Sequence, residues 1–234
     1  MSTNRDGQRG SMGIITALEL QKRNKKRVNV FIDDEFSFSV SLDDAARLRK
    51  GQTLSPAEIE ALRGDAAVQR AVDSAARLLT TRPRSEHEIR QKLTEKETPP
   101  VVIDAAVVRL TQLGYIDDLA FARFWVQERS LHKPLSPQAL RYELRQKGIA
   151  DAIIQELLEA VDPDESAVRA AHSRAARLRG STRREFRENL SGFLLRRGFQ
   201  YSVIKAALRQ VIENLEAEDP RFFAPDSGED AADE

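Results

Sequence analysis

The sequence predicts a mainly α-helical protein: an elongated array of three tandem three-helix repeats, preceded by a small N-terminal β-hairpin or sheet and a helix segment. The main observation is a pattern that recurs about every fifty residues. Its first copy comprises Ser85, Ile89, Arg90, Leu93, Lys96, Ile103 and Leu110, and its second comprises Ser136, Leu140, Arg141, Leu144, Lys147, Ile154 and Val161. A looser third copy comprises Leu194, Arg197, Gly198, Phe199, Ile204 and Val211. Repeats of this length usually stack into a body with a long lateral surface, which is typical of proteins that bind macromolecules.

The second observation is a change of hydrophobic period near the N-terminus. Apolar residues alternate with polar ones, as in β-strands, at Val28, Val30, Ile32, Phe36, Phe38 and Val40. A three-residue turn at residues 33–35 pairs Ile32 with Phe36. The same turn pairs Val30 with Phe38, so that all six apolar side chains share one face of the hairpin.

The third observation is a series of helix start and stop signals after residue 42. Capping residues stand at Ser55, Ser85, Ser136 and Thr182, with Asp117 as a further candidate cap. Gly114, Gly148 and Gly198 stand where helices should end, because glycine accepts the left-handed conformation that stops a helix. These signals delimit nine predicted helices, at 67–80, 85–96, 100–113, 118–130, 136–147, 151–160, 164–178, 182–197 and 200–216.

The elements are expected to group into consecutive segments. Residues 14–22 are a candidate third strand beside the hairpin. The predicted segments are a disordered N-terminus at 1–13, a β-hairpin plus short helices at 14–64, a first three-helix repeat at 65–130, helices of the second repeat at 131–162 with its third helix at 164–178, a third repeat at 179–215 and an acidic disordered tail at 216–234.

Charge is distributed unevenly although the chain has no net charge. Residues 166–209 contain ten arginines and one lysine but only two acidic residues, whereas residues 216–234 contain eight acidic residues and one arginine. A basic module followed by an acidic tail indicates an acidic or polyanionic partner, and the tail is a candidate competitor for the same surface. A charged helical surface with a solubilising tail explains the same pattern.

Composition and motifs favour a cytoplasmic binding protein over an enzyme. There is no cysteine, no apolar run long enough to span a bilayer and no signal-peptide core at the N-terminus, so we expect no membrane association. Glycine-rich phosphate loops are absent, and His87, His132 and His172 lack partners at metal-ligand spacing. We therefore expect no catalytic residues, no cofactor and no metal, and we expect a monomer.

Basic residues of the second and third repeats are the candidate binding residues, because arginine offers a planar fork of donors to phosphate or carboxylate. They are Arg141, Arg145, Lys147, Arg183, Arg184, Arg187, Arg196, Arg197, Lys205 and Arg209. Pairing with neighbouring acids such as Glu143 is the alternative explanation for part of this set. No aromatic platform interleaves with these residues in the sequence, which disfavours sequence-specific recognition of single strands. Phe121, Phe124 and Trp125 are expected to form a core.

Several motifs in order resemble the RecX family of recombinase regulators. They are "RSEHEIRQKL" at 84–93, "LGYIDDLAFARFWV" at 113–126, "LRYELRQKGI" at 140–149 and "FLLRRGFQYSVI" at 193–204, with "LRKGQTLSPAEI" at 48–59 before them. The resemblance covers about residues 14–212. The chain departs from the pattern at Glu97, where the other two copies have Gly148 and Gly198, and in its acidic tail.

The resemblance implies a protein without catalysis that binds the RecA recombinase and its filament on single-stranded DNA. Such proteins limit the growth of the filament or promote its disassembly, and so reduce ATP hydrolysis, strand exchange and the co-protease activity behind the SOS response. They also contact single- or double-stranded DNA themselves. A stand-alone DNA-binding helical-repeat module that acts by competing for DNA is the first alternative. An interaction scaffold for unrelated proteins is the second, and an enzyme is the last.

Overall fold

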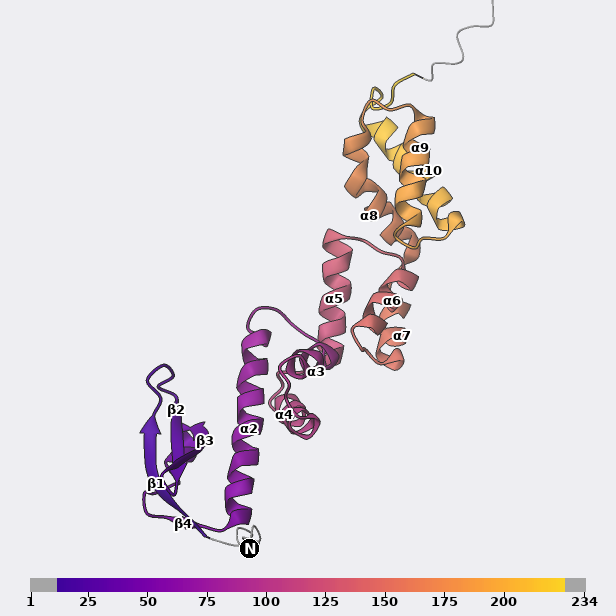
Figure 1. Ribbon diagram of the computed structural model, residues 1–234. Helices are drawn as coiled ribbons and strands as arrows, with labels where there is room; N and C mark the ends of the chain where they lie inside the picture. Colours follow the sequence, from indigo (N-terminus) through magenta and orange to yellow (C-terminus); the bar gives the residue numbers. More distant parts are fainter. Residues whose placement is uncertain (1–11, 226–234) are drawn as a thin grey trace, which may run out of the picture. The chain divides into compact units, whose positions relative to one another are not determined.

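The computed structural model describes residues 12–225 and divides into two compact units, Met1–Ile116 and Asp117–Glu234 (Figure 1). No helix within the described residues is long and apolar enough to cross a membrane. The first unit contains β1 (Gly13–Leu20), β2 (Arg27–Ile32), β3 (Glu35–Ser41), the short α1 (Leu42–Ala45), β4 (Thr53–Leu54), α2 (Pro56–Leu79), α3 (Glu86–Thr94) and α4 (Pro100–Gln112). The second contains α5 (Asp118–His132), α6 (Pro137–Gln146), α7 (Asp151–Glu159), α8 (Pro163–Ala175), a 3₁₀ turn (Ala176–Leu178), α9 (Arg183–Leu195) and α10 (Tyr201–Glu218).

The strands form one antiparallel sheet in the order β3-β2-β1-β4, which confirms the hairpin and the third strand. Of the predicted N-terminal disorder, residues 1–11 lie outside the described part, and Gly13 already begins β1.

The hairpin turn differs from the predicted three-residue loop. Asp33 and Asp34 form a two-residue turn with φ of 49° and 68°, so that Ile32 pairs with Glu35 instead of Phe36. A β-bulge at Ser37 then restores the predicted pairing of Val30 with Phe38. The bulge compensates for the shorter turn.

The expected single apolar face of the hairpin is wrong for one residue. Phe36 is 59% exposed and its ring lies against Phe31, with centroids 6.0 Å apart. The other five side chains of the predicted face, from Val28 to Val40, are buried in the core beneath the sheet.

A single helix, α2, serves two cores. It begins with the predicted capping box at Ser55 and continues without a break through Gly64 to Leu79. Short helices up to residue 64 and a separate helix from residue 67 were expected from the sequence. Its first half packs on the sheet through Ala66, and its second half packs on α3 and α4 through Ala71 and Ala75. In Figure 1 the sheet and the α3–α4 pair accordingly lie on opposite sides of α2.

Each of the three helix groups has its own buried cluster, which confirms the tandem helical repeats. The clusters join α2–α4 (Ala71 to Ile116), α5–α7 (Phe121 to Leu158) and α8–α10 with the segment that follows (Ala167 to Phe222). The predicted boundary at residue 130 assigned α5 to the first repeat. The structure places α5 in the second repeat instead, because its Phe121 packs on α6 and α7. The aromatic stack of Phe121 and Trp125, with centroids 5.8 Å apart, belongs to this middle core.

The middle helix of each group ends in the same way. The residue after its last turn adopts a left-handed conformation at Glu97 (φ 57°), Gly148 (φ 76°) and Gly198 (φ 84°). In each case the next residue donates its backbone N–H to a carbonyl five residues earlier, as from Thr98 to Leu93. Glu97 therefore keeps the helix end that its departure from the repeat pattern placed in doubt.

The end of α9 joins the second and third repeats within the second unit. The Ser136 backbone N–H donates to the Arg197 carbonyl at 3.1 Å, and the Arg197 guanidinium donates to the Pro134 carbonyl at 2.8 Å. A Cβ on Gly198 would lie 2.7 Å from the Ser136 hydroxyl and 3.0 Å from the Ala139 Cβ. Only glycine fits this junction, because it needs both a positive φ and close backbone approach.

The acidic tail was expected to be disordered from residue 216, and the structure contradicts this as far as Pro225. Glu216 pairs with Arg183 and Asp219 pairs with Arg179. Phe222 is 5% exposed and its ring packs edge-on against Phe186, with centroids 6.0 Å apart. Residues 226–234 lie outside the described part of the chain.

Candidate macromolecular interface

Three of the predicted basic residues line one groove on the second unit. Arg187 of α9 and Lys205 and Arg209 of α10 surround a hollow of about 570 Å³, together with Tyr201 and Ser191. The side chains of all three basic residues are exposed. No aspartate or glutamate of residues 12–225 lines this hollow, which we call the α9–α10 groove.

Helical spacing accounts for the α9–α10 groove. Tyr201, Lys205 and Arg209 are four residues apart, so they lie in one stripe on α10. The adjacent face of α10 is buried through Ile204, Leu208 and Val211 against α8 and α9, and Ile204 and Leu208 also line the groove. Burial of the apolar face therefore directs the basic stripe outward, beside Arg187 of α9.

Two further predicted residues line a second groove where the second and third repeats meet. Arg141 and Arg145 project from one face of α6 into a hollow of about 760 Å³, with Tyr142 between them in the sequence. Gly198 and Phe199 form part of its other wall. The described residues contribute no carboxylate to the lining of this junction groove.

Arg145 already has an acidic partner beside the junction groove. Its Nε lies 2.7 Å from Asp151 Oδ1. The hydrogen bond raises the pKa of Arg145 and lowers the pKa of Asp151, with the charges of Arg145 and Arg141 lowering the latter further. Because both side chains are exposed, water screens this pair strongly, and a phosphate can replace Asp151 at low cost.

The two grooves adjoin each other across the first turn of α10. Gln200 and Val203 line the junction groove, and Tyr201 and Ser202 line the α9–α10 groove. Five of the ten predicted residues are thus brought together along neighbouring hollows, and they come from α6, α9 and α10.

The other predicted residues lie elsewhere. Arg183 is engaged by Glu216, and its guanidinium lies 5.9 Å from the ring centroid of Phe223. Lys147 lies over the Trp125 ring, with Nζ 4.9 Å from the centroid. Arg184 and Arg196 are exposed on α9 and at its end but line neither groove.

Arg197 has a structural place at the junction of the repeats. Besides its bond to the Pro134 carbonyl, its guanidinium lies 4.3 Å from the centroid of the Phe193 ring. Burial, followed by the charge of Arg174, lowers the pKa of Arg197. We therefore separate Arg197 from the candidate binding residues.

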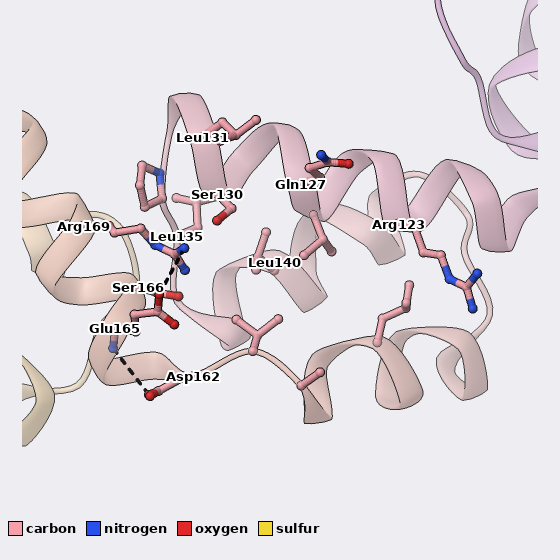
Figure 2. A pocket seen from close by; sticks show the side chains of 15 residues that line it. Arg123, Gln127, Ser130, Leu131, Leu135, Leu140, Asp162, Glu165, Ser166 and Arg169 are labelled. Carbon is pink, nitrogen blue, oxygen red and sulfur yellow. Dashed lines mark hydrogen bonds and ion pairs between the residues drawn. The ribbon is translucent and has the colours of Figure 1, made fainter.

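A third hollow of the second unit has a different character. Figure 2 shows the space of about 440 Å³ between α5 and the segment that leads into α8, with Leu131, Leu135 and Leu140 among its walls. Its charges are balanced, because Arg169 pairs with Glu165 at 3.4 Å and Asp162 lies at the rim. This hollow lacks the excess positive charge of the two grooves.

Two tyrosines in the grooves were missed in the sequence. Tyr142 and Tyr201 are 66% and 73% exposed, although no aromatic side chain was expected among the basic residues. The signal was present in their spacing: Tyr142 follows Arg141 directly, and Tyr201 is in step with Lys205 and Arg209.

A basic turn of the first unit was also missed. The β1–β2 connection exposes Lys22, Arg23, Lys25 and Lys26 within five residues. Its position outside the repeats explains why the repeat pattern gave no indication of it.

Family models match most of the chain in four consecutive parts. Residues 13–55 match the N-terminal domain of regulatory protein RecX, and residues 71–110, 117–158 and 162–208 match the first, second and third three-helix domains of RecX. The four parts correspond to the sheet with β4 and to the helix groups α2–α4, α5–α7 and α8–α10.

Curated relatives and solved structures agree with these matches. The chain is 34% identical over 204 residues to regulatory protein RecX of Bacillus velezensis, covering 85% of this chain and 78% of the relative. It is 31% identical over 210 residues to that of Listeria welshimeri, covering 88% and 78%. A crystal structure of regulatory protein RecX superposes with a TM-score of 0.63 at 26% identity, covering 86% of this chain and 99% of that one. RecX from Lactobacillus salivarius shares the fold, with a TM-score of 0.53 at 22% identity, covering 63% and 97%.

Proposed function

We propose that this chain, which belongs to the RecX family of regulatory proteins, binds the RecA recombinase and its filament on single-stranded DNA. Binding restrains ATP hydrolysis, strand exchange and co-protease activity, and so limits homologous recombination in DNA repair and the SOS response. No catalysis by the chain itself is required, because a ligand that favours one arrangement of the subunits shifts the filament toward it.

The observation that carries this proposal is the clustering of cations in the two grooves. Arg141, Arg145, Arg187, Lys205 and Arg209 come from three helices of two repeats and face hollows without a lining carboxylate among residues 12–225. Such a surface attracts an acidic protein face or a phosphate backbone, which are the two components of a nucleoprotein filament.

The direct test measures single-stranded-DNA-dependent ATP hydrolysis by RecA, titrated with the chain at fixed salt and with DNA in excess. Inhibition well below one chain per RecA subunit supports action on the filament. Inhibition that begins only when the DNA is saturated contradicts it and favours simple competition for DNA.

Charge reversal in the α9–α10 groove tests the surface itself. The triple variant Arg187→Glu, Lys205→Glu and Arg209→Glu should raise the half-inhibitory concentration about tenfold or more, because favourable contacts become repulsive. Arg183 and Arg184 are left out of this set, because Arg183 is engaged by Glu216 and Arg184 lines neither groove.

The matched control reverses Arg47, Arg49 and Lys50, three exposed cations of the first unit. It changes the net charge equally and should leave inhibition close to that of the unmodified chain. Equal loss of inhibition in both triples would show that net charge, and not the groove, is responsible.

A second candidate function is DNA binding without RecA. The same acid-free grooves favour it, and it predicts an affinity for bare DNA that falls steeply with salt. For single strands the logarithmic slope is about 0.7 per phosphate contacted, so the triple groove variant should lower the slope by about 2.

A further inference from the structure

Tyr142 and Tyr201 are exposed aromatic rings at the two grooves. They account for two of the four large apolar side chains exposed in the described part of the second unit, with Leu131 and Leu195. Within residues 12–225 neither ring stacks on another aromatic side chain, and neither hydroxyl makes a hydrogen bond. Intramolecular packing therefore does not account for their positions.

Each tyrosine is fixed among cations by its own helix. Tyr142 lies on α6 beside Arg141 and one turn before Arg145, and all three line the junction groove. Tyr201 begins α10 and stands one turn before Lys205 in the α9–α10 groove. Each hollow thus holds one ring together with basic side chains, and neighbouring residues at the start of α10 line both hollows.

This combination has a specific physical meaning. An acidic protein surface satisfies the cations and can also bury tyrosine rings, but it does not present phosphates and flat rings together along one strand. A single-stranded nucleic acid uses both groups, because its phosphates follow the cations while its unpaired bases stack on the rings. In a duplex the bases are stacked on one another, so the rings contribute much less to its binding.

We propose that the junction groove and the α9–α10 groove form one binding track for single-stranded nucleic acid, in which bases stack on Tyr142 and Tyr201. Arg141, Arg187, Lys205 and Arg209 contact the phosphates. Arg145 joins them when a phosphate displaces Asp151. The track binds without regard to sequence, because every base presents a flat face to the ring.

The track deepens the proposed function, since it assigns part of the groove surface to the DNA strand of the filament. It also allows the chain to prefer single strands over duplex in the absence of any recombinase. That second property is measurable alone, so the track and the action on RecA can succeed or fail separately.

The test uses the full chain and fluorescence anisotropy of two labelled strands of equal length. One is oligothymidylate, and the other carries abasic sites throughout, so the phosphates are equal and only the bases differ. The unmodified chain should bind oligothymidylate more tightly than the abasic strand. Each Tyr→Ala change should weaken oligothymidylate binding by about 5- to 150-fold and leave abasic binding unchanged.

Two further variants separate stacking from other effects. Tyr142→Phe with Tyr201→Phe keeps both rings and should bind like the unmodified chain. Tyr115→Ala removes an exposed ring of the first unit, 59% exposed and outside both grooves, and should have no effect. The chain has only these three tyrosines, so the control set is complete.

The outcomes are distinct. Equal affinity of the unmodified chain for the two strands, or equal loss on both strands in the alanine variants, would overturn stacking. Binding of neither strand would also overturn the track. Inhibition of RecA by a chain that binds neither strand would leave the proposed function intact, whereas base-dependent binding without any inhibition would support the track and contradict the proposed function.

Discussion

Glu97 occupies a left-handed backbone position that the other two repeats give to Gly148 and Gly198. For a residue with a Cβ this conformation costs about 1–2 kcal/mol in the folded state. Glycine avoids this cost, but it also gives the unfolded chain more conformational entropy, which cancels part of the gain in stability. Glu97→Gly should therefore raise the free energy of unfolding by about 0.5–1 kcal/mol, measured by urea denaturation followed by circular dichroism.

The control at this position is Glu97→Ala, which removes the carboxylate but keeps the Cβ. It should give no gain. Equal stabilisation by alanine and glycine would show that the side chain, and not the backbone conformation, is the unfavourable component.

Arg197 and Arg187 illustrate what single residues disclose in the sequence. Both were candidate binding residues because both are arginines in an acid-poor segment. Only the fold shows that Arg197 donates to the Pro134 carbonyl, 63 positions earlier, whereas Arg187 faces a groove. Charge composition is local information, but the partner of a charge is set by tertiary contacts.

At the scale of elements, the turn between α9 and α10 holds two repeats together. Gly198→Ala should lower the free energy of unfolding of the second unit by more than Gly180→Ala. Both residues have positive φ, of 84° and 82°, but a Cβ at Gly180 meets nothing within 4 Å. The left-handed penalty of about 1–2 kcal/mol is common to both variants, so the excess at Gly198 reports the contact with Ser136 and Ala139.

The measurement follows the fluorescence of Trp125, the only tryptophan, which is partly buried against the core of the second repeat. Identical destabilisation by the two substitutions would contradict a close junction between the repeats.

Elements were predictable from the sequence where local chemistry decides them. Caps at Ser55, Ser136 and Thr182 and stops at the three glycines form as expected, because capping bonds and positive φ are properties of a few neighbouring residues. The length of the hairpin turn was predicted wrongly because the turn is one residue shorter than expected and a bulge at Ser37 adds one residue to the strand. Val30 and Phe38 therefore still pair, so the alternation of apolar residues does not reveal the difference. The length of α2 was missed because burial on both sides overrides the weak helix preference of Gly64.

At the scale of the whole molecule, the opposite charges of the basic module and the C-terminal segment already meet in the folded chain. Arg179 and Arg183 are engaged by Asp219 and Glu216, and Phe222 anchors the segment beside Phe186. Deleting residues 216–234 to test whether the acidic tail competes for the basic surface would therefore also remove part of a core. A chain that ends at Pro225 keeps these contacts and is the proper variant for that question.

This anchor makes a prediction about stability. Phe222→Ala should lower the free energy of unfolding of the second unit by about 3 kcal/mol, because it leaves a cavity against Phe186 and Phe223. The chain that ends at Pro225 should match the full chain in the same urea titration. A loss below about 1 kcal/mol in Phe222→Ala would mean that the segment is not part of the core.

The shared helix α2 bears on how the chain acquires its structure during synthesis. The sheet leaves the ribosome first, but its buried face is covered only when residues up to Ala66 have followed. The other side of α2 stays exposed until α3 and α4 are complete, near Ile116. Because domains fold as units while the chain emerges from the N-terminus, the first 116 residues should become protease-resistant in one step, not as a sheet followed by a repeat.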